Sequence, residues 1–301
     1  MGQSVKDVHY DAILTQVSLG YRLPSLVAEE VFPVVKVKKE SDTYLKWSSV
    51  EKKILDDKRA AGTPAKDWGD IKWTTGTYSC VEHALKKPVP DRVRDNADAP
   101  IKPKLNAVKQ MTYAIKLGYE KRVAQLAQDT GQIPNAAASV AWDAANPNIE
   151  DDIDAAKEAF RTRNGFMPNA IIIPYQVARY VVKYLKANSD LSIKERYTIW
   201  KLPDVIYDMK TISPQAIEDT AAFGVASSLS NVWGDVVTLC YINPNPGLDD
   251  VSFGWTIRSR DWRVRRWRDE EREAEIVETS VVQDEVLVAP EFAQIITGIL
   301  T

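Results

Sequence analysis

The segment between Val31 and Val81 constrains the fold most, because it is long, extended and charged. Apolar side chains recur at roughly alternating positions on both of its arms, and this spacing is typical of half-buried β-strands. The middle is rich in Lys, Asp and Glu and contains Gly62, Pro64 and Gly69, which predicts the tip of a long hairpin. The alternating residues are Val35, Val37, Tyr44 and Trp47 on the first arm and Ile71, Trp73 and Tyr78 on the second.

A hairpin of this length has almost no core of its own. An isolated pair of strands is only marginally stable in water, so the hairpin needs another surface to lie on. That surface belongs either to the rest of the same chain or to a neighbouring subunit.

The composition describes an ordinary globular protein. At 301 residues the chain is long enough to bury a sizeable core in one large domain or two small ones. It contains 45% hydrophobic and 27% charged residues, which is typical of soluble proteins. The net charge of −3 argues against a protein whose main task is to coat nucleic acid.

Cysteine usage and the N-terminus point to a protein made in the cytoplasm. Cys80 and Cys240 are the only cysteines, too few for a disulfide framework or a zinc site. The N-terminus lacks the apolar core of a signal peptide, and no run of about 18 apolar residues occurs. We therefore expect a soluble protein without membrane contact.

Residues 104–131 predict one long helix. Apolar residues recur there every three or four positions and form a single stripe, and Gly131 is a plausible C-terminal stop. A helix of some 25 residues spans roughly 37 Å, which suggests a spine rather than a member of a compact bundle. The stripe consists of Leu105, Val108, Met111, Ile115, Tyr119, Val123 and Leu126.

The flanking segments differ in texture. Before the hairpin we expect an arm with a short helix around Tyr10 to Val17. After the spine, residues 136–249 predict a compact α/β unit with a helix between Asn148 and Gly165 and a helix opened by Pro174. Strands are expected in VIYDMKTI and VVTLCYINP, and the last fifty or so residues return to long strands with charged faces.

A search for catalytic motifs finds none of the common nucleophile, dinucleotide, phosphate-binding or metalloprotease patterns. His9 and His83 are the only histidines, and surface or packing roles explain them better than a metal site. Four acids from Glu150 to Asp154 fit the first turns of a helix through the macrodipole. Both cysteines are best interpreted as small hydrophobic residues. We expect no catalytic residue, cofactor or metal.

The strongest electrostatic feature is a run of arginines and tryptophans that is followed at once by acids. Arginines interleaved with aromatic residues could stack on bases. Blocks of both signs favour salt bridges between subunits or a self-compensating ladder on a sheet, and we prefer these to a solvated surface or a nucleic-acid site. The residues are Arg258, Arg260, Arg263, Arg265, Arg266 and Arg268, with Trp255, Trp262 and Trp267, followed by Asp269, Glu270, Glu271, Glu273 and Glu275.

The order of these elements resembles the major capsid protein of tailed bacteriophages, which has the Hong Kong 97-type fold. LVAEEVFPVVKVKKESDTYLKW is similar to that family's entry into its extended loop, and NGFMPNAIIIPYQVARYVVKYLK to the opening of its axial domain. DEVLVAPEFAQIITGIL resembles the closing segment of its peripheral domain. The resemblance covers essentially the whole chain, through the order of its motifs.

The resemblance implies an α+β fold of four parts: an N-terminal arm (1–34), an extended β-hairpin loop (35–80), a peripheral domain (81–135 with 250–301) and an axial domain (136–249). It also implies a virion protein, made in the host cytoplasm, that assembles into pentamers and hexamers around double-stranded DNA without sequence-specific contact. The chain begins directly with the arm, so a separate scaffolding protein, or none, is implied, together with a portal.

The resemblance and the charge pattern together give a set of candidate contacts between subunits. Some relatives cross-link a loop lysine to a neighbour's asparagine, but nothing singles out one of Lys52, Lys53, Lys58 and Lys66 for this. Two alternatives stay open: an encapsulin-type compartment enclosing a cargo enzyme, and a hydrolase or transferase built on the α/β unit. The candidate contacts are Lys52, Lys53, Lys58, Arg59, Trp68, Arg263, Arg265, Arg266, Glu270 and Glu271.

Overall fold

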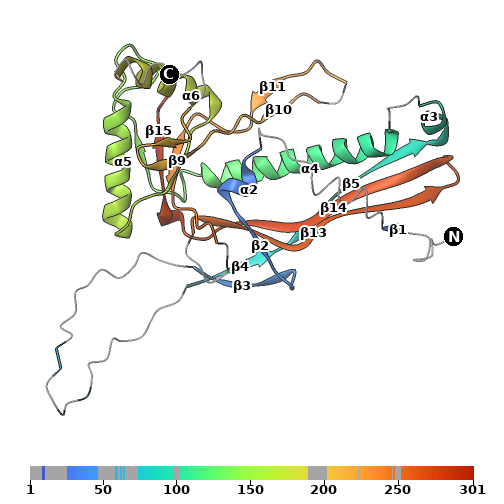
Figure 1. Cartoon of the computed structure of the whole chain (residues 1–301), viewed down its shortest axis with the longest axis horizontal. Coiled ribbons are helices and arrows are strands. Elements are labelled where there is room, and N and C mark those ends of the chain that lie inside the picture. The colour runs from blue at the N-terminus through green and yellow to red at the C-terminus, as the bar shows by residue number, and fades with distance from the viewer. Residues whose placement is uncertain are drawn as a thin grey trace.

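The computed structural model describes residues 9–10, 26–46, 58–59, 62, 64, 74–97, 102–188, 202–222, 224–245, 247 and 252–301. The fold is α+β, as the sequence predicts, and consists of an elongated sheet with a long helix on one face, joined to a second, mixed sheet flanked by two helices (Figure 1).

The elongated sheet is built around two long antiparallel strands, β13 (Gly254–Asp269) and β14 (Ala274–Leu287). β5 (Val81–Pro90) pairs with the outer edge of β14. The N-terminal segment supplies two short strands to β13: β1 (His9–Tyr10) is antiparallel and β2 (Val34–Lys36) is parallel. Segments from both ends of the sequence therefore form one sheet.

β13 contains a bulge. Its register against β14 shifts between Arg258 and Arg260 and again between Arg260 and Arg263. A bulge adds residues to one strand, bends it and redirects its side chains. Here the extra residues carry Asp261 and Trp262 toward other parts of the subunit.

The spine helix α4 (Pro103–Ala127) lies along the elongated sheet (Figure 1). Its buried residues Val108 and Met111 pack with Val264 of β13 and Val277 of β14, and Ile115 packs with Trp262 and Val281. The predicted helix and its apolar stripe are confirmed. The predicted stop is wrong, because the helix ends at Ala127 and Gln128 caps it, before Gly131.

The second sheet belongs to the α/β unit and has the strand order β6-β15-β12-β7-β9-β8. Its strands are β6 (Asn135–Ala137), β7 (Ala170–Ile172), β8 (Val205–Ile206), β9 (Met209–Ile212), β12 (Val237–Cys240) and β15 (Ala293–Thr297). The segment VIYDMKTI is a tight hairpin rather than one strand, because Tyr207 and Asp208 adopt positive φ between β8 and β9.

Two helices pack on this sheet, α5 (Ile149–Asn164) and α6 (Tyr175–Asn188). Both were predicted: Asn148 precedes α5, Gly165 ends it in the left-handed conformation, and Pro174 precedes α6. The buried sides of both helices contribute to one apolar core with β7 and β12. The end of α4 packs into a second core with residues of the same sheet.

The remaining elements are short. They are α2 (Ala28–Val31), β3 (Ser41–Lys46), β4 (Thr74–Ser79), α3 (Asp91–Asp95), β10 (Ile217–Asp219), β11 (Leu229–Asn231) and the 3-10 turn η2 (Pro290–Phe292). The β10–β11 hairpin is fixed to the spine by an ion pair between Lys121 and Glu218 (2.7 Å). In the described part of the chain, no helix is long and apolar enough to cross a membrane.

One expected placement differs from the structure, and another lies mostly outside the described residues. The range 250–301 was expected in the peripheral domain, but its last strand, β15, pairs with β12 and β6 in the second sheet, which otherwise consists of strands from residues 135–240. The physical reason is the chain reversal at η2, which brings Phe292 and Ala293 next to β12. The helix expected from Tyr10 to Val17 lies outside the described residues except for Tyr10, which is in β1.

Candidate assembly interface

The candidate interface consists of the described residues next to the segments that the sequence predicts to be an arm and an extended loop. We call residues 26–36 the arm root and strands β3 and β4 the loop root. Both roots are held by contacts within the chain.

Glu120 of the spine helix holds the start of the arm root. Its carboxylate is fully buried. Oε2 accepts hydrogen bonds from the backbone N–H groups of Val27 (2.9 Å) and Ala28 (2.8 Å), and Oε1 accepts one from the indole N–H of Trp233 (2.7 Å). Burial raises the pKa of Glu120, and these hydrogen bonds oppose the rise. One carboxylate thus joins the arm, the spine and the axial unit.

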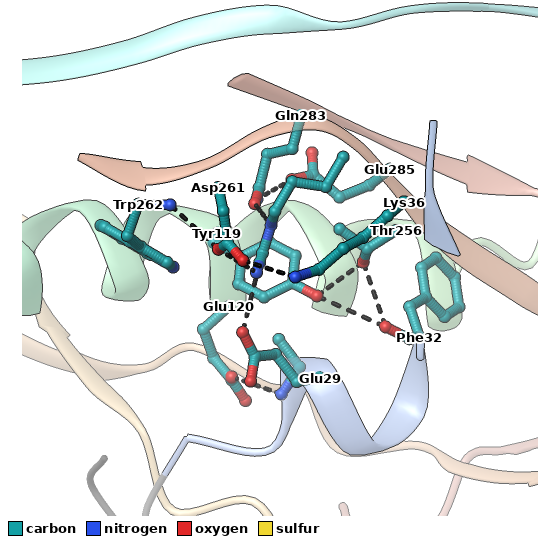
Figure 2. Close-up of polar contacts among 12 residues, drawn as sticks. Glu29, Phe32, Lys36, Tyr119, Glu120, Thr256, Asp261, Trp262, Gln283 and Glu285 are labelled. Carbon is teal, nitrogen blue, oxygen red and sulfur yellow. Dashed lines mark hydrogen bonds and ion pairs between the residues drawn. The ribbon is translucent and has the colours of Figure 1, made fainter. Parts of the chain in front are cut away.

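The neighbouring residue Tyr119 holds the middle of the arm root. Its hydroxyl lies 2.6 Å from Oγ1 of Thr256, and the Thr256 hydroxyl donates to the carbonyl of Phe32 (3.1 Å) (Figure 2). Burial raises the pKa of Tyr119. The Phe32 ring lies edge-on to Phe253, 5.5 Å between centroids, and it closes over Gly254, where a Cβ atom would lie 2.5 Å from the ring.

A chain of alternating charges fastens both ends of the arm root to the bulge of β13 (Figure 2). Arg258, which is buried, contacts Glu29 (3.2 Å) and Asp261 (3.4 Å), and Asp261 in turn contacts Lys36 (2.8 Å). Arg258 also donates to Gln283 of β14 (3.1 Å). Burial works to raise the pKa of Asp261, but the hydrogen bonds from Lys36 and the backbone of Trp262 hold it below its usual value.

The bulge also contacts the spine. Trp262 packs on Ile115, and the ammonium group of Lys116 lies 5.5 Å from the centroid of the Trp262 ring. A cation at this distance from an aromatic face is attracted to it. The bulge is therefore the point where the arm root, the long strands and the spine helix meet.

The loop root packs against the elongated sheet of the same chain. Tyr44 of β3 and Tyr78 of β4 are buried against Val35, Trp255 and Ile257 of the elongated sheet. The backbone N–H of Ser79 donates to Asp284 of β14 (2.8 Å). The surface that the base of the hairpin needs is therefore supplied by the same chain, because alternation places both tyrosines on the side that faces the elongated sheet.

The arginine-rich strand compensates its own charge. Arg265 pairs with Glu278 directly across on β14, Arg266 contacts Glu275 (3.4 Å), and Arg263 lies 3.9 Å from Glu82 of β5. Opposite charges on facing strands stabilise a sheet. The interpretation as a ladder on a sheet therefore accounts for these arginines within one subunit.

The candidate contacts are spread over three regions. Arg263, Arg265 and Arg266 lie on β13, and Glu270 and Glu271 are exposed at the β13–β14 turn. Lys58 and Arg59 are exposed in the loop. Lys52, Lys53, Lys66 and Trp68 lie outside the described residues, as do Trp47, Ile71 and Trp73.

Most of the contacts that anchor the arm root come from residues that the sequence pattern did not mark. These residues are Glu29, Glu120, Trp233 and Asp261. One signal was present for Glu120: it lies one turn before Ala124 and two turns before Ala127, which are both buried, so it lies on the inner side of the spine. An acid at such a position needs donors around it.

The other residues considered for chemistry have structural surroundings. Cys240 is buried in β12, whereas Cys80 is half-buried next to the loop root, and burial raises the pKa of both thiols. Glu150, Asp151 and Asp152 lie in the first turn of α5. Among the residues that the structure describes, no group of three His, Cys, Asp or Glu side chains is placed to hold a metal ion.

Comparisons with known proteins agree with this architecture. The sequence matches no family model. It is 25% identical to the major capsid protein of Burkholderia phage BcepMu over 99% of both chains, and 29% identical to that of Pseudomonas phage JBD67 over 38% of both. The solved structure of a phage-related protein from Bordetella bronchiseptica RB50 superposes with a TM-score of 0.71 at 22% identity and covers 96% of this chain and 97% of that one.

A second solved structure, the capsid of cyanophage P-SCSP1u, matches with a TM-score of 0.60 at 11% identity, covering 98% of this chain and 94% of that one. The chain has the Hong Kong 97-type capsid fold. Its sequence is similar to two phage major capsid proteins, and for one of them the similarity runs along nearly the whole length of both chains. We use the name axial unit for the second sheet with α5 and α6, because these elements lie in the range that the sequence predicts to be the axial domain.

Proposed function

We propose that this protein is the major capsid protein of a tailed phage and that its copies form the icosahedral shell of the head as pentamers and hexamers. The similarity to the BcepMu major capsid protein over 99% of both chains carries this proposal. The capsid fold supports it independently. The role is structural and needs no catalytic group.

The arm and the extended loop are the elements through which one subunit contacts its neighbours. Their roots are fixed rigidly within the chain, which is the arrangement expected of segments that must leave in a defined direction. Lys52, Lys53, Lys58, Arg59 and Trp68 of the loop are the proposed contacts. Glu270 and Glu271, exposed at the far end of the long strands, are proposed contacts as well.

The remaining partners follow from the same role. Double-stranded DNA fills the shell without sequence-specific contact, consistent with a net charge of −3. A portal occupies one vertex, and a separate scaffolding protein guides assembly. The mature protein is located in the virion after synthesis in the host cytoplasm.

Particle formation tests the proposal. The purified protein, alone and with the scaffolding protein from its own gene neighbourhood, is followed by light scattering and electron microscopy. Closed shells of uniform diameter are the expected product. A chain that stays monomeric under every condition, with and without the scaffold, would contradict the proposed function.

An encapsulin-type compartment uses the same fold and is the second candidate. The curated relatives named above are both major capsid proteins, so the comparisons do not favour it. Neighbouring genes separate the two: portal and terminase genes belong to a phage head, whereas a gene for a cargo enzyme belongs to a compartment.

A further inference from the structure

One helix of the axial unit carries an acidic row on its outer side. Glu150, Asp154 and Glu158 of α5 are exposed and follow one another at intervals of four residues. Such residues lie on the same side of a helix, about 6 Å apart along its axis. Glu158 is paired with Arg161 of the same helix, but neither Glu150 nor Asp154 has a hydrogen bond or ion pair with any residue that the structure describes.

The helix dipole explains only part of this row. Acids in a first turn are favourable, which accounts for Glu150. Asp154 lies in the second turn, where the dipole has little effect, and like charges four residues apart destabilise a helix. Lys157 and Arg161, three residues after Asp154 and Glu158, offset part of this repulsion. A positive surface against the row would offset the rest.

The neighbouring helix α6 carries the opposite charge. Its sequence contains Arg179, Lys183 and Lys186 and no acid. Arg179 is stacked on Tyr180, 4.6 Å from the ring centroid. Lys183 is exposed and, within the described ranges, makes no hydrogen bond or ion pair. Arg179 and Lys183 are again four residues apart and repel each other.

Both helices face outward from one core. Ile149, Ile153 and Ala156 of α5 and Val177 and Val181 of α6 are buried together on the axial sheet, so the charged sides point away from it. Figure 1 shows α5 along the outer edge of the axial unit, with α6 beside it. One subunit thus offers an acidic side and a basic side, each lacking an opposite charge at its centre.

We propose that the acidic row of α5 in one subunit docks against the basic row of α6 in the next subunit of the same ring. The occupant of each surface is a second copy of this chain, because the two surfaces of one subunit are complementary in sign and spacing. A contact between two different surfaces repeats head to tail and closes into a ring when the rotation permits. This inference rests on the proposed shell function and specifies one contact within it.

Charge reversal at the two residues without partners tests the contact. Asp154→Lys and Lys183→Asp each place like charges against each other, and we expect at least about tenfold less material in rings and shells at equal protein concentration. The double variant Asp154→Lys/Lys183→Asp restores opposite charges in swapped positions and should recover assembly to within about twofold of the wild type. Native mass spectrometry and electron microscopy measure the product.

Lys109→Asp is the matched control. Lys109 lies on the spine helix and makes no ion pair with a described residue. The Lys109→Asp substitution changes the net charge by the same amount as Lys183→Asp. It should leave assembly unchanged. Circular dichroism checks that each variant is folded. If a single variant does not fold, ring formation by the wild type is measured as a function of salt concentration. At 1 M salt the screening length is about 3 Å, so we expect fewer rings at high salt than at low salt.

The outcomes separate this inference from the function on which it rests. If the wild type forms no particles, the proposed function itself fails. If the wild type assembles and both single variants assemble equally well, the α5–α6 contact is wrong while the shell function stands. The contact is also wrong if the single variants do not assemble and the double variant does not recover assembly. Wild-type rings that are as stable at high salt as at low salt would contradict it as well.

Discussion

At the scale of single residues, the subunit depends on a few polar side chains that connect segments far apart in the sequence. Glu120 collects N–H donors from the arm root and from Trp233, and Arg258 joins Glu29, Asp261 and Gln283. A buried polar group costs free energy unless it is hydrogen-bonded, so such a residue requires all its partners to be in place at once. These hydrogen bonds and ion pairs therefore fix the conformation of the arm root.

Glu120→Ala should destabilise the subunit by about 3 kcal/mol, because it leaves buried donors on Val27, Ala28 and Trp233 without an acceptor. Asp152→Ala is the matched control. Asp152 accepts from the Trp142 indole (2.9 Å) and the Ser139 backbone (3.0 Å), but it is partly exposed, so water can replace it. Urea denaturation measures both, and equal losses would contradict the role assigned to burial.

The same carboxylate should make stability depend on pH. Burial raises the pKa of Glu120, so the folded chain holds the proton more tightly than the unfolded chain. Its contribution is therefore complete below the pKa of the unfolded chain and is lost as pH rises through the folded pKa. The unfolding free energy of the wild type relative to Glu120→Gln should fall between acidic and neutral pH. A difference that grows with pH would show that the N–H donors outweigh burial.

Two glycines should respond in opposite ways to alanine. Gly254→Ala places a Cβ 2.5 Å from the Phe32 ring, which cannot move freely in the core, so we expect a loss of about 1–3 kcal/mol. Gly118 lies within the spine helix, where the nearest atom to an added Cβ is 3.6 Å away on Arg122, an ordinary contact distance, so Gly118→Ala should gain about 0.5–1 kcal/mol. Thermal melting measures the stability of both variants. An unchanged melting temperature for Gly254→Ala would mean that the arm root shifts to make room for the added Cβ.

At the scale of elements, the loop root is anchored within the subunit by Tyr44, Tyr78 and the Ser79–Asp284 hydrogen bond. The charged residues between β3 and β4 show no such apolar anchor in the sequence pattern. We therefore propose that the root serves folding and that the charged residues serve contact with a neighbouring subunit.

Deleting residues 50–70 and closing the loop with a short glycine–serine linker should give a subunit with wild-type circular dichroism and melting temperature that forms no stable shells. Tyr78→Ala is the opposite case: it removes a buried side chain from the root and should lower stability by about 3 kcal/mol or more. Global unfolding of the deletion variant would mean that the loop packs within its own chain.

The elements that sequence patterns predicted are those whose signal is local. The spine stripe, the Gly165 stop of α5 and the proline before α6 depend on neighbours within one or two turns, and all three were confirmed. Asn148 takes the N-cap position of α5, but its side chain makes no capping hydrogen bond and donates to Asp151 instead. The turn at Tyr207 and Asp208 and the bulge near Asp261 were missed, because non-glycine residues take such conformations only under tertiary constraint. The partners of Glu120 lie 92 to 113 positions away and leave no periodic trace.

At the scale of the whole molecule, the two ends of the chain close the two sheets. The arm root adds β2 to the elongated sheet, and the C-terminal segment adds β15 to the axial sheet between β6 and β12. The four-part division expected from the sequence therefore describes the order of the chain better than its folding units. The axial unit is not a continuous insert, since it needs a strand from the far end.

Removing residues 290–301 should consequently disrupt the axial unit although the deletion lies outside its expected range. The deletion removes β15 from between β6 and β12, exposes the edge of β12 and takes the side chains of Phe292, Ile295 and Ile296 out of the protein interior. Hydrogen exchange should show lost protection in β7, β12 and α6, with β13 and β14 less affected because they pair with each other over most of their length. As the matched control, deletion of residues 1–8 stops short of β1 and should leave exchange in both sheets unchanged. Retained protection of β12 in the C-terminal deletion would mean that residues 136–249 fold as an independent unit.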